Sequence, residues 1–152
     1  MADEKVIDSL DVSRRFIDSV LNGPPPPTNQ LAKSLDELAY AYQFAPVAEL
    51  LDEEDDSDVN PPANHEGLYS LVAERFPDLG PYSVADPFDL ESQEVLISDA
   101  IDDIRDILID LQEVVWRADN QSENDARWYF RMLFEIHWGM HLRQLSLYLH
   151  AK

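Results

Sequence analysis

Hydrophobic residues recur along most of this chain at three- and four-residue steps, the spacing that places them on one face of an α-helix. No segment alternates apolar and polar residues for long enough to predict a sheet. The expected fold is therefore all-α, a single-domain helical bundle of four to six helices whose last two form a long antiparallel hairpin. The predicted helices span residues 6–21, Thr28 or Ser34 to Pro46, 66–76, 92–118 and 123–150.

Proline, glycine and acidic residues divide the chain into three parts within this single domain. Asn22 and Gly23 end the first helix, and the four prolines at 24–27 favour a stiff extended linker over a ligand motif for a polyproline-binding partner. The run 52–58 is rich in aspartate, but it lacks the spacing and the glycine of an EF-hand calcium loop, so we expect a solvated loop. The parts are the first helix (1–23), the linker, second helix and acidic loop (24–65), and a helical core (66–152).

Acidic residues outnumber basic ones so strongly that charge limits the possible partners. The 152 residues, enough for one domain, include 31 Asp or Glu and 11 Lys or Arg, which gives a formal net charge of −20. Such a charge repels nucleic acids and anionic membrane surfaces, so neither is expected as a partner. A basic protein, a cationic ligand or a divalent metal ion would be attracted. Adaptation to a salty habitat is the alternative explanation of this acidity, and it says nothing about mechanism.

The chain has neither cysteine nor a candidate targeting or membrane segment. The lack of cysteine excludes disulfides, thiolate metal sites and cysteine nucleophiles, and it fits a reducing compartment. Residues 1–12 are acidic and lack the basic start and apolar run of a signal peptide. No apolar run reaches the ~20 residues that a membrane span requires. We therefore expect a cytoplasmic protein.

The predicted helix over 92–118 separates into an apolar arc, which begins at Leu96 and Ile97, and an acidic face. Like charges four residues apart on a helix cost ~0.2–0.5 kcal/mol per pair unless something neutralises them. A solvated face is the simplest interpretation. The alternative is a Mg²⁺ site for phosphate chemistry, because carboxylates on successive turns are typical ligands of this ion. The acidic face consists of Asp99, Asp102, Asp103, Asp106, Asp110 and Glu113.

The predicted last helix places His137 and His141 four residues apart. This spacing suits zinc, but the residue after His137 is not a catalytic glutamate, and zinc needs a third protein ligand. The simpler interpretation is structural, with a histidine ring nitrogen hydrogen-bonded to a carboxylate, since buried polar groups need partners. Candidate third ligands are His65, Glu135 and the acidic helix, and the candidate metal set is Asp102, Asp106 and His141. Because the hairpin brings the acidic helix alongside, the expected partner of His141 is Asp99, Asp102, Asp103 or Asp106, in a polar cluster that includes His137.

The last helix also contains the expected packing anchors. These are Trp128, Phe134 and Trp138, together with Gly139, whose bare backbone admits the close approach of another helix or an aromatic ring. A second apolar strip lies on another side of the helix and consists of Tyr129, Ile136, Met140 and Leu147. A helix that is apolar on two sides is either central in the bundle or shared with a partner.

These C-terminal segments resemble domain-of-unknown-function family 5063, small bacterial all-helical proteins. The residues that carry the resemblance are Asp102, Asp103, Ile104, Arg105 and Asp106 in the acidic segment, and Trp128, Phe134, His137, Trp138, Gly139, His141, Leu142 and His150 in the last helix. The stretch 67–89 also looks like the family's short helix and tyrosine-rich connector, so the resemblance covers about residues 66–150. The family has no assigned activity. The resemblance therefore implies a helical fold and a cytoplasmic location, and it favours a specific His–Asp contact over a fully solvated acidic face.

Two hypotheses about function follow from these patterns. The leading one is a non-enzymatic module that binds another protein, or a second copy of itself, through the two-sided apolar helix. The alternative is a divalent-metal-dependent hydrolase of a phosphorylated small molecule that uses the acidic face, His137 and His141. Neither a nucleophile motif nor a phosphate-binding glycine loop accompanies these residues. No cofactor is expected, except Mg²⁺ or Zn²⁺ under the alternative.

Overall fold

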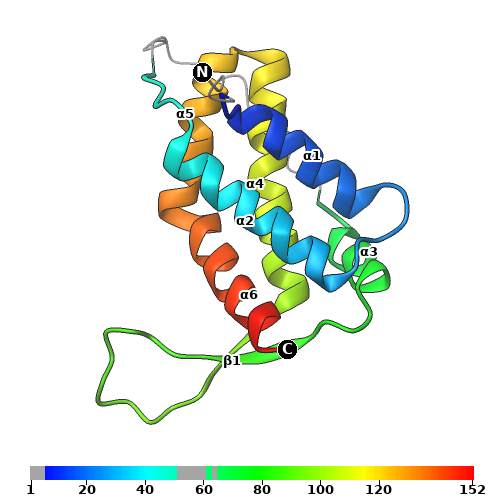
Figure 1. Cartoon of the computed structure of the whole chain (residues 1–152), viewed down its shortest axis with the longest axis vertical. Helices are drawn as coiled ribbons and strands as arrows, with labels where there is room; N and C mark the ends of the chain where they lie inside the picture. Colours follow the sequence, from blue (N-terminus) through cyan, green and yellow to red (C-terminus); the bar gives the residue numbers. More distant parts are fainter. Residues whose placement is uncertain (1–5, 51–60, 63–64) are drawn as a thin grey trace, which may run out of the picture.

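The computed structural model describes residues 6–50, 61–62 and 65–152, which form an all-α bundle with one small sheet (Figure 1). Its helices are α1 (Ser9–Leu21), α2 (Thr28–Phe44), α3 (Leu68–Arg75), α4 (Ala100–Asn120), α5 (Glu123–Leu133), the π-helical segment η1 (Phe134–Trp138) and α6 (Gly139–Ala151). The strands are β1 (Pro81–Val84) and β2 (Leu96–Asp99). The aspartate-rich run 52–58 lies outside the described residues. Within the described ranges, no helix is both long and apolar enough to cross a membrane.

Helix α4 is the centre of the bundle. It packs against α1, α3, α5 and α6, while α1 and α2 cross in front of it in Figure 1. α4 and the continuous run α5–η1–α6 form the antiparallel hairpin that the sequence predicts. The apolar face of α4 is completely buried at Ile104, Ile107, Leu108, Leu111 and Val114. Burial of each such side chain stabilises the fold by ~1.5–3 kcal/mol, so this face fixes the rotation of α4 in the bundle.

The sheet corrects the prediction that the chain contains none and that a helix begins near residue 92. β1 and β2 pair antiparallel, with Pro81 opposite Asp99 and Val84 opposite Leu96. The Asp99 carboxylate accepts a hydrogen bond from the backbone N–H of Ile101, so it caps α4 at its first turn. Strand pairing with a segment 15 residues or so earlier is a non-local interaction, which helical periodicity does not reveal. Leu96 and Ile97, expected in the buried arc, are instead 49% and 76% exposed.

The last helix is interrupted by one π-helical turn, which accommodates Gly139. A Cβ added at Gly139 would collide with the backbone oxygen of Phe134 and lie 2.9 Å from its ring. The sequence predicts close approach of another helix or an aromatic ring at this glycine. The group that approaches is the ring and carbonyl of Phe134, five residues earlier in the same helix, because the wider turn brings them over residue 139.

Two of the three expected aromatic anchors lie in the core. Trp138 is 0% exposed and packs edge-to-face against Phe130 and Phe134, with ring centroids 5.1 and 4.7 Å apart. Phe134 also stacks on Tyr42 of α2 at 3.9 Å, which ties α2 to the hairpin. Trp128 is only partly buried and contacts Tyr129 rather than the core cluster. Trp128 therefore packs at the margin of the core, through Tyr129, which itself lies against the core cluster.

Candidate functional site

Two histidine–aspartate pairs cross the seam between α4 and the last helix. Nδ1 of His137 lies 2.6 Å from Oδ2 of Asp110, and Nδ1 of His141 lies 2.8 Å from Oδ1 of Asp103. Asp103 and Asp110 are seven residues apart on α4, and His137 and His141 are four residues apart on the last helix. Both spacings return to the same face of a helix, so the two pairs lie on facing surfaces of antiparallel helices. Of the partners that the sequence allowed for His141, the structure places Asp103 at Nδ1 and Asp106 at Nε2, the latter at 3.3 Å.

The acidic face of α4 is divided between solvent and interior. Asp103 and Asp110 are 1% and 6% exposed, so a uniformly solvated face is wrong for these two residues. A buried carboxylate loses its hydration and requires hydrogen-bond donors. The two imidazoles supply such donors.

Asp99, Asp102 and Asp106 of this face also contact side chains or backbone groups other than the histidines. Asp99 caps α4 and accepts a hydrogen bond from the Tyr69 hydroxyl. Asp102 and Asp106 share Arg105, at 2.6 and 3.0 Å. Of the expected polar cluster, the structure thus brings together His137, His141, Asp103 and Asp106, and it leaves Asp99 and Asp102 at the margin.

Asp110 and Tyr82 belong to the cluster although sequence reasoning did not assign them to it. Asp110 could have been found, since Asp106 and Asp110 repeat the four-residue spacing of His137 and His141. Tyr82 could not, because it comes from β1 and reaches α4 only through the sheet. Its hydroxyl donates to Asp103, and its ring stacks on Tyr148 of α6 at 4.6 Å. Burial, and then the hydrogen bond to Asp103, raise the pKa of Tyr82, so it remains a donor at all ordinary pH values.

Burial, hydrogen bonds and neighbouring charges shift the pKa values of three groups in and beside the cluster. The hydrogen bond to Asp103 raises the pKa of His141 against the opposing effect of burial, and the charge of Asp106 raises this pKa further. Burial raises the pKa of Asp110, with the His137 hydrogen bond opposing it. Burial and repulsion by Asp106 raise the pKa of Asp102. The surroundings therefore favour an added positive charge at this seam.

Stability is expected to fall as the pH rises above about 6.5, the ordinary pKa of histidine. The pKa of His141 is raised in the folded state, so its contribution is complete below about pH 6.5 and is lost as the pH passes through the raised value. Thermal unfolding between about pH 6 and about pH 9, in the presence of a chelator, measures this loss. The decrease should be smaller in His141→Gln. A pH-independent melting temperature, or an equal decrease in the variant, would contradict the assignment.

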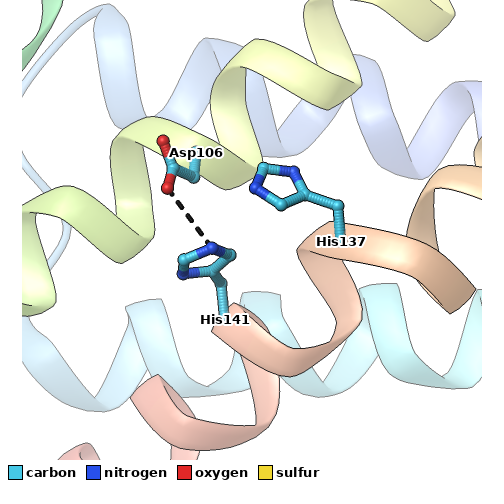
Figure 2. Close-up of side chains that lie close together, drawn as sticks. All are labelled: Asp106, His137 and His141. Carbon is cyan, nitrogen blue, oxygen red and sulfur yellow. Dashed lines mark ion pairs between the residues drawn. The ribbon is translucent and has the colours of Figure 1, made fainter. Parts of the chain in front are cut away.

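Three side chains at the seam offer metal-ligand atoms to a common point. One ligand atom each of Asp106, His137 and His141 lies within 4.8 Å of the other two (Figure 2). Of the third ligands considered from sequence, His65 lines a hollow elsewhere on α4, and Glu135 accepts a hydrogen bond from Tyr42. The metal set expected from sequence thus retains Asp106 and His141, with His137 in the place of Asp102.

A second surface feature lies where α6 ends beside the sheet. A groove of about 730 Å³ separates the base of the β1–β2 hairpin from the end of α6, with Val84, Val95, Leu147 and Tyr148 among its lining. Leu147 is the last member of the outer apolar strip of the last helix, where Ile136, Met140 and Leu147 are 70%, 60% and 68% exposed. The loop between the strands projects from this end of the bundle in Figure 1 and carries Phe88 and Leu90, which are 92% and 91% exposed.

Comparison with known proteins finds a solved structure with a similar fold. The chain is similar to protein BF1032 from Bacteroides fragilis. That crystal structure matches with a TM-score of 0.66 and 19% sequence identity over 97% of this chain and 91% of the other. At this identity the likeness shows the fold alone. Neither a family model nor a curated protein sequence matches the chain, so the resemblance to family 5063 stays an expectation.

Proposed function

We propose that this protein is a non-enzymatic helical module that binds a protein partner through the groove beside α6 and the apolar strip leading into it. One observation carries the proposal: a helix whose inner side is core also exposes Ile136, Met140 and Leu147 at 60–70%. Large contiguous apolar surface costs solubility and is typical of interaction sites. The absence of cysteine supports placing this interaction in the cytoplasm.

The charge around the groove identifies the kind of partner. Glu94 lines it, and the adjoining loop adds Asp86, Asp89 and Glu91. A second copy would bring the same charges and a net −20 of its own, so like-charge repulsion opposes self-association. A partner segment with one apolar face and a rim of lysine or arginine matches both the groove and its border. We therefore propose a cationic amphipathic helix as the bound element.

A labelled peptide of leucine and lysine, designed as an amphipathic helix of about five turns, tests this proposal by fluorescence anisotropy at physiological salt. We expect saturable binding to the intact protein. Leu147→Ser and Val95→Ser should each weaken it about tenfold, equivalent to ~1.4 kcal/mol. Both side chains are exposed, at 68% and 69%, so the variants should fold normally.

Controls separate the groove from general attraction between opposite charges. Phe44→Ser removes a side chain of similar exposure, 66%, on α2, and it should leave binding unchanged. A peptide of the same composition with a scrambled, non-amphipathic order should bind weakly. Equal binding of the two peptides, or equal losses in the Phe44 and Leu147 variants, would contradict the proposal. A concentration-dependent dimer that Leu147→Ser abolishes would instead identify a second copy as the partner.

A further inference from the structure

The tautomers of His137 and His141 are set by their buried partners. Each Nδ1 lies within hydrogen-bond distance of a carboxylate, Asp110 for His137 and Asp103 for His141. A carboxylate oxygen accepts, so Nδ1 carries the proton and donates it. In the neutral ring, Nε2 then has a free lone pair. The same arrangement, a carboxylate behind a ligating imidazole, orients histidines at metal centres.

The atoms that have a lone pair available for a metal ion lie close to one another at the seam. Nε2 of His141 lies 3.3 Å from Oδ2 of Asp106, and Figure 2 shows the His137 ring directed toward the same point. For a tetrahedral ion with bonds of about 2.0–2.1 Å, two ligand atoms are about 3.3 Å apart. The Asp106–His141 edge therefore already has the required length. His137 completes the triangle within 4.8 Å, and its side chain is 44% exposed, which leaves it room to adjust.

A hydrogen bond or an ion pair to a further residue orients each of these three side chains. Asp110 and Asp103 orient the two imidazoles, and Tyr82 in turn donates to Asp103. Arg105 contacts Oδ1 of Asp106 at 3.0 Å, which leaves Oδ2 directed toward His141. These outer contacts direct one potential ligand atom of each of the three side chains toward the others.

We propose that His137, His141 and Asp106 form a binding site for a divalent first-row transition ion, with Zn²⁺ as the strongly bound representative. Two imidazoles and one carboxylate suit zinc, iron(II) or cobalt, whereas Mg²⁺ and Ca²⁺ prefer oxygen ligands alone. The local charge agrees, because three carboxylates, Asp103, Asp106 and Asp110, lie against the two imidazoles, and the Arg105 that contacts Asp106 is shared with Asp102. Three protein ligands leave at least one coordination position for water or for another molecule.

Such an ion would join α4, which contributes Asp106, to the last helix on either side of Gly139. It would stabilise the hairpin because it binds the folded arrangement and not the separated helices. Water in the open position would have its pKa lowered to about 7. This is the nucleophile that the metal-dependent hydrolysis considered from sequence would require, and the site does not depend on the proposed protein interaction.

The experiment uses the full-length, untagged protein, stripped with a chelator and titrated with Co²⁺ and then Zn²⁺. We expect about one Co²⁺ per chain with the visible absorption of a tetrahedral or five-coordinate centre, displacement by Zn²⁺, and a rise in melting temperature. His137→Gln and Asp106→Asn should abolish the absorption band. Asp110→Asn keeps all three ligands but removes the orienting carboxylate, and it should weaken binding by about 10–100-fold.

A matched control excludes adventitious binding. His150→Gln removes an exposed histidine from the same helix. It should leave Co²⁺ affinity unchanged. Because His137 is partly exposed, its glutamine variant should keep the wild-type circular dichroism, so loss of binding there is not loss of fold. Binding that survives in His137→Gln, falls equally in His150→Gln, or is displaced by equimolar Mg²⁺ would overturn the proposal. Loss of peptide binding in Leu147→Ser would not affect it.

Discussion

Replacing Asp103 with alanine is expected to lower the free energy of unfolding by about 3–5 kcal/mol. The Asp103 carboxylate is 1% exposed and accepts hydrogen bonds from His141 and from Tyr82. Its removal leaves an imidazole and a phenol without their acceptor in a partly buried seam, and unpaired polar groups there carry a desolvation cost. It also removes the hydrogen bond between Tyr82 of β1 and α4. Urea unfolding at neutral pH, followed by circular dichroism, measures the effect.

The neighbouring Asp102→Ala is the matched control. Its side chain is 40% exposed and pairs with Arg105, which keeps Asp106 as a partner. An exposed ion pair contributes ~0–1 kcal/mol, so this change should cost little. If the two variants differ from each other by less than about 0.5 kcal/mol, the buried network does not stabilise the protein as we describe.

Trp138→Ala is expected to cost about 3–5 kcal/mol, the usual range for truncating a buried aromatic residue. Trp138 is completely buried, and its ring contacts Phe130 and Phe134 edge-to-face. The substitution opens a cavity under the π-turn, so it should also loosen the positions of His137 and Gly139. Chemical denaturation measures the loss of stability, and the Co²⁺ titration described above should show weakened binding in any folded fraction.

Trp128→Ala gives the comparison within the same helical run. Trp128 is partly exposed and lies outside the core cluster, so its removal should cost less than half as much as the loss of Trp138. Equal costs for the two tryptophans would mean that α5 is more deeply packed than the structure shows.

Local periodicity accounts for much of what the sequence predicts correctly. The apolar spacing of 28–44 and 123–150 agrees with α2 and with the run from α5 to α6. The spacing His137–His141, facing an acidic helix, was enough to expect a His–Asp contact. Each of these inferences depends on residues within one or two helical turns, where geometry is fixed by the backbone. Pro46 ended α2 as expected, because a proline disfavours helical backbone in the residue before it.

Other features depend on contacts between residues far apart in the chain. Leu96 and Ile97 fit a helical pattern, yet they form a strand because 81–84 is available to pair with them. Gly139 is a different case, because the group that fills the space beside it, Phe134, lies only five residues earlier, in a π-turn that departs from the 3.6-residue period used for the prediction.

The sequence by itself determined an acidic all-α chain with a central hairpin, and it identified most of the polar residues along that seam. The tertiary structure decided which of them face inward. Asp103 and Asp110 are buried beside histidines, whereas Asp102 remains partly exposed with Arg105. The physical reason is the rotation of α4 about its own axis. A rotation by a few tens of degrees would change which carboxylates are buried and which face solvent, while the apolar periodicity of the sequence stayed the same. The packing of the Ile104, Ile107 and Leu111 face against the rest of the bundle fixes that rotation, and so determines which carboxylates meet the histidines.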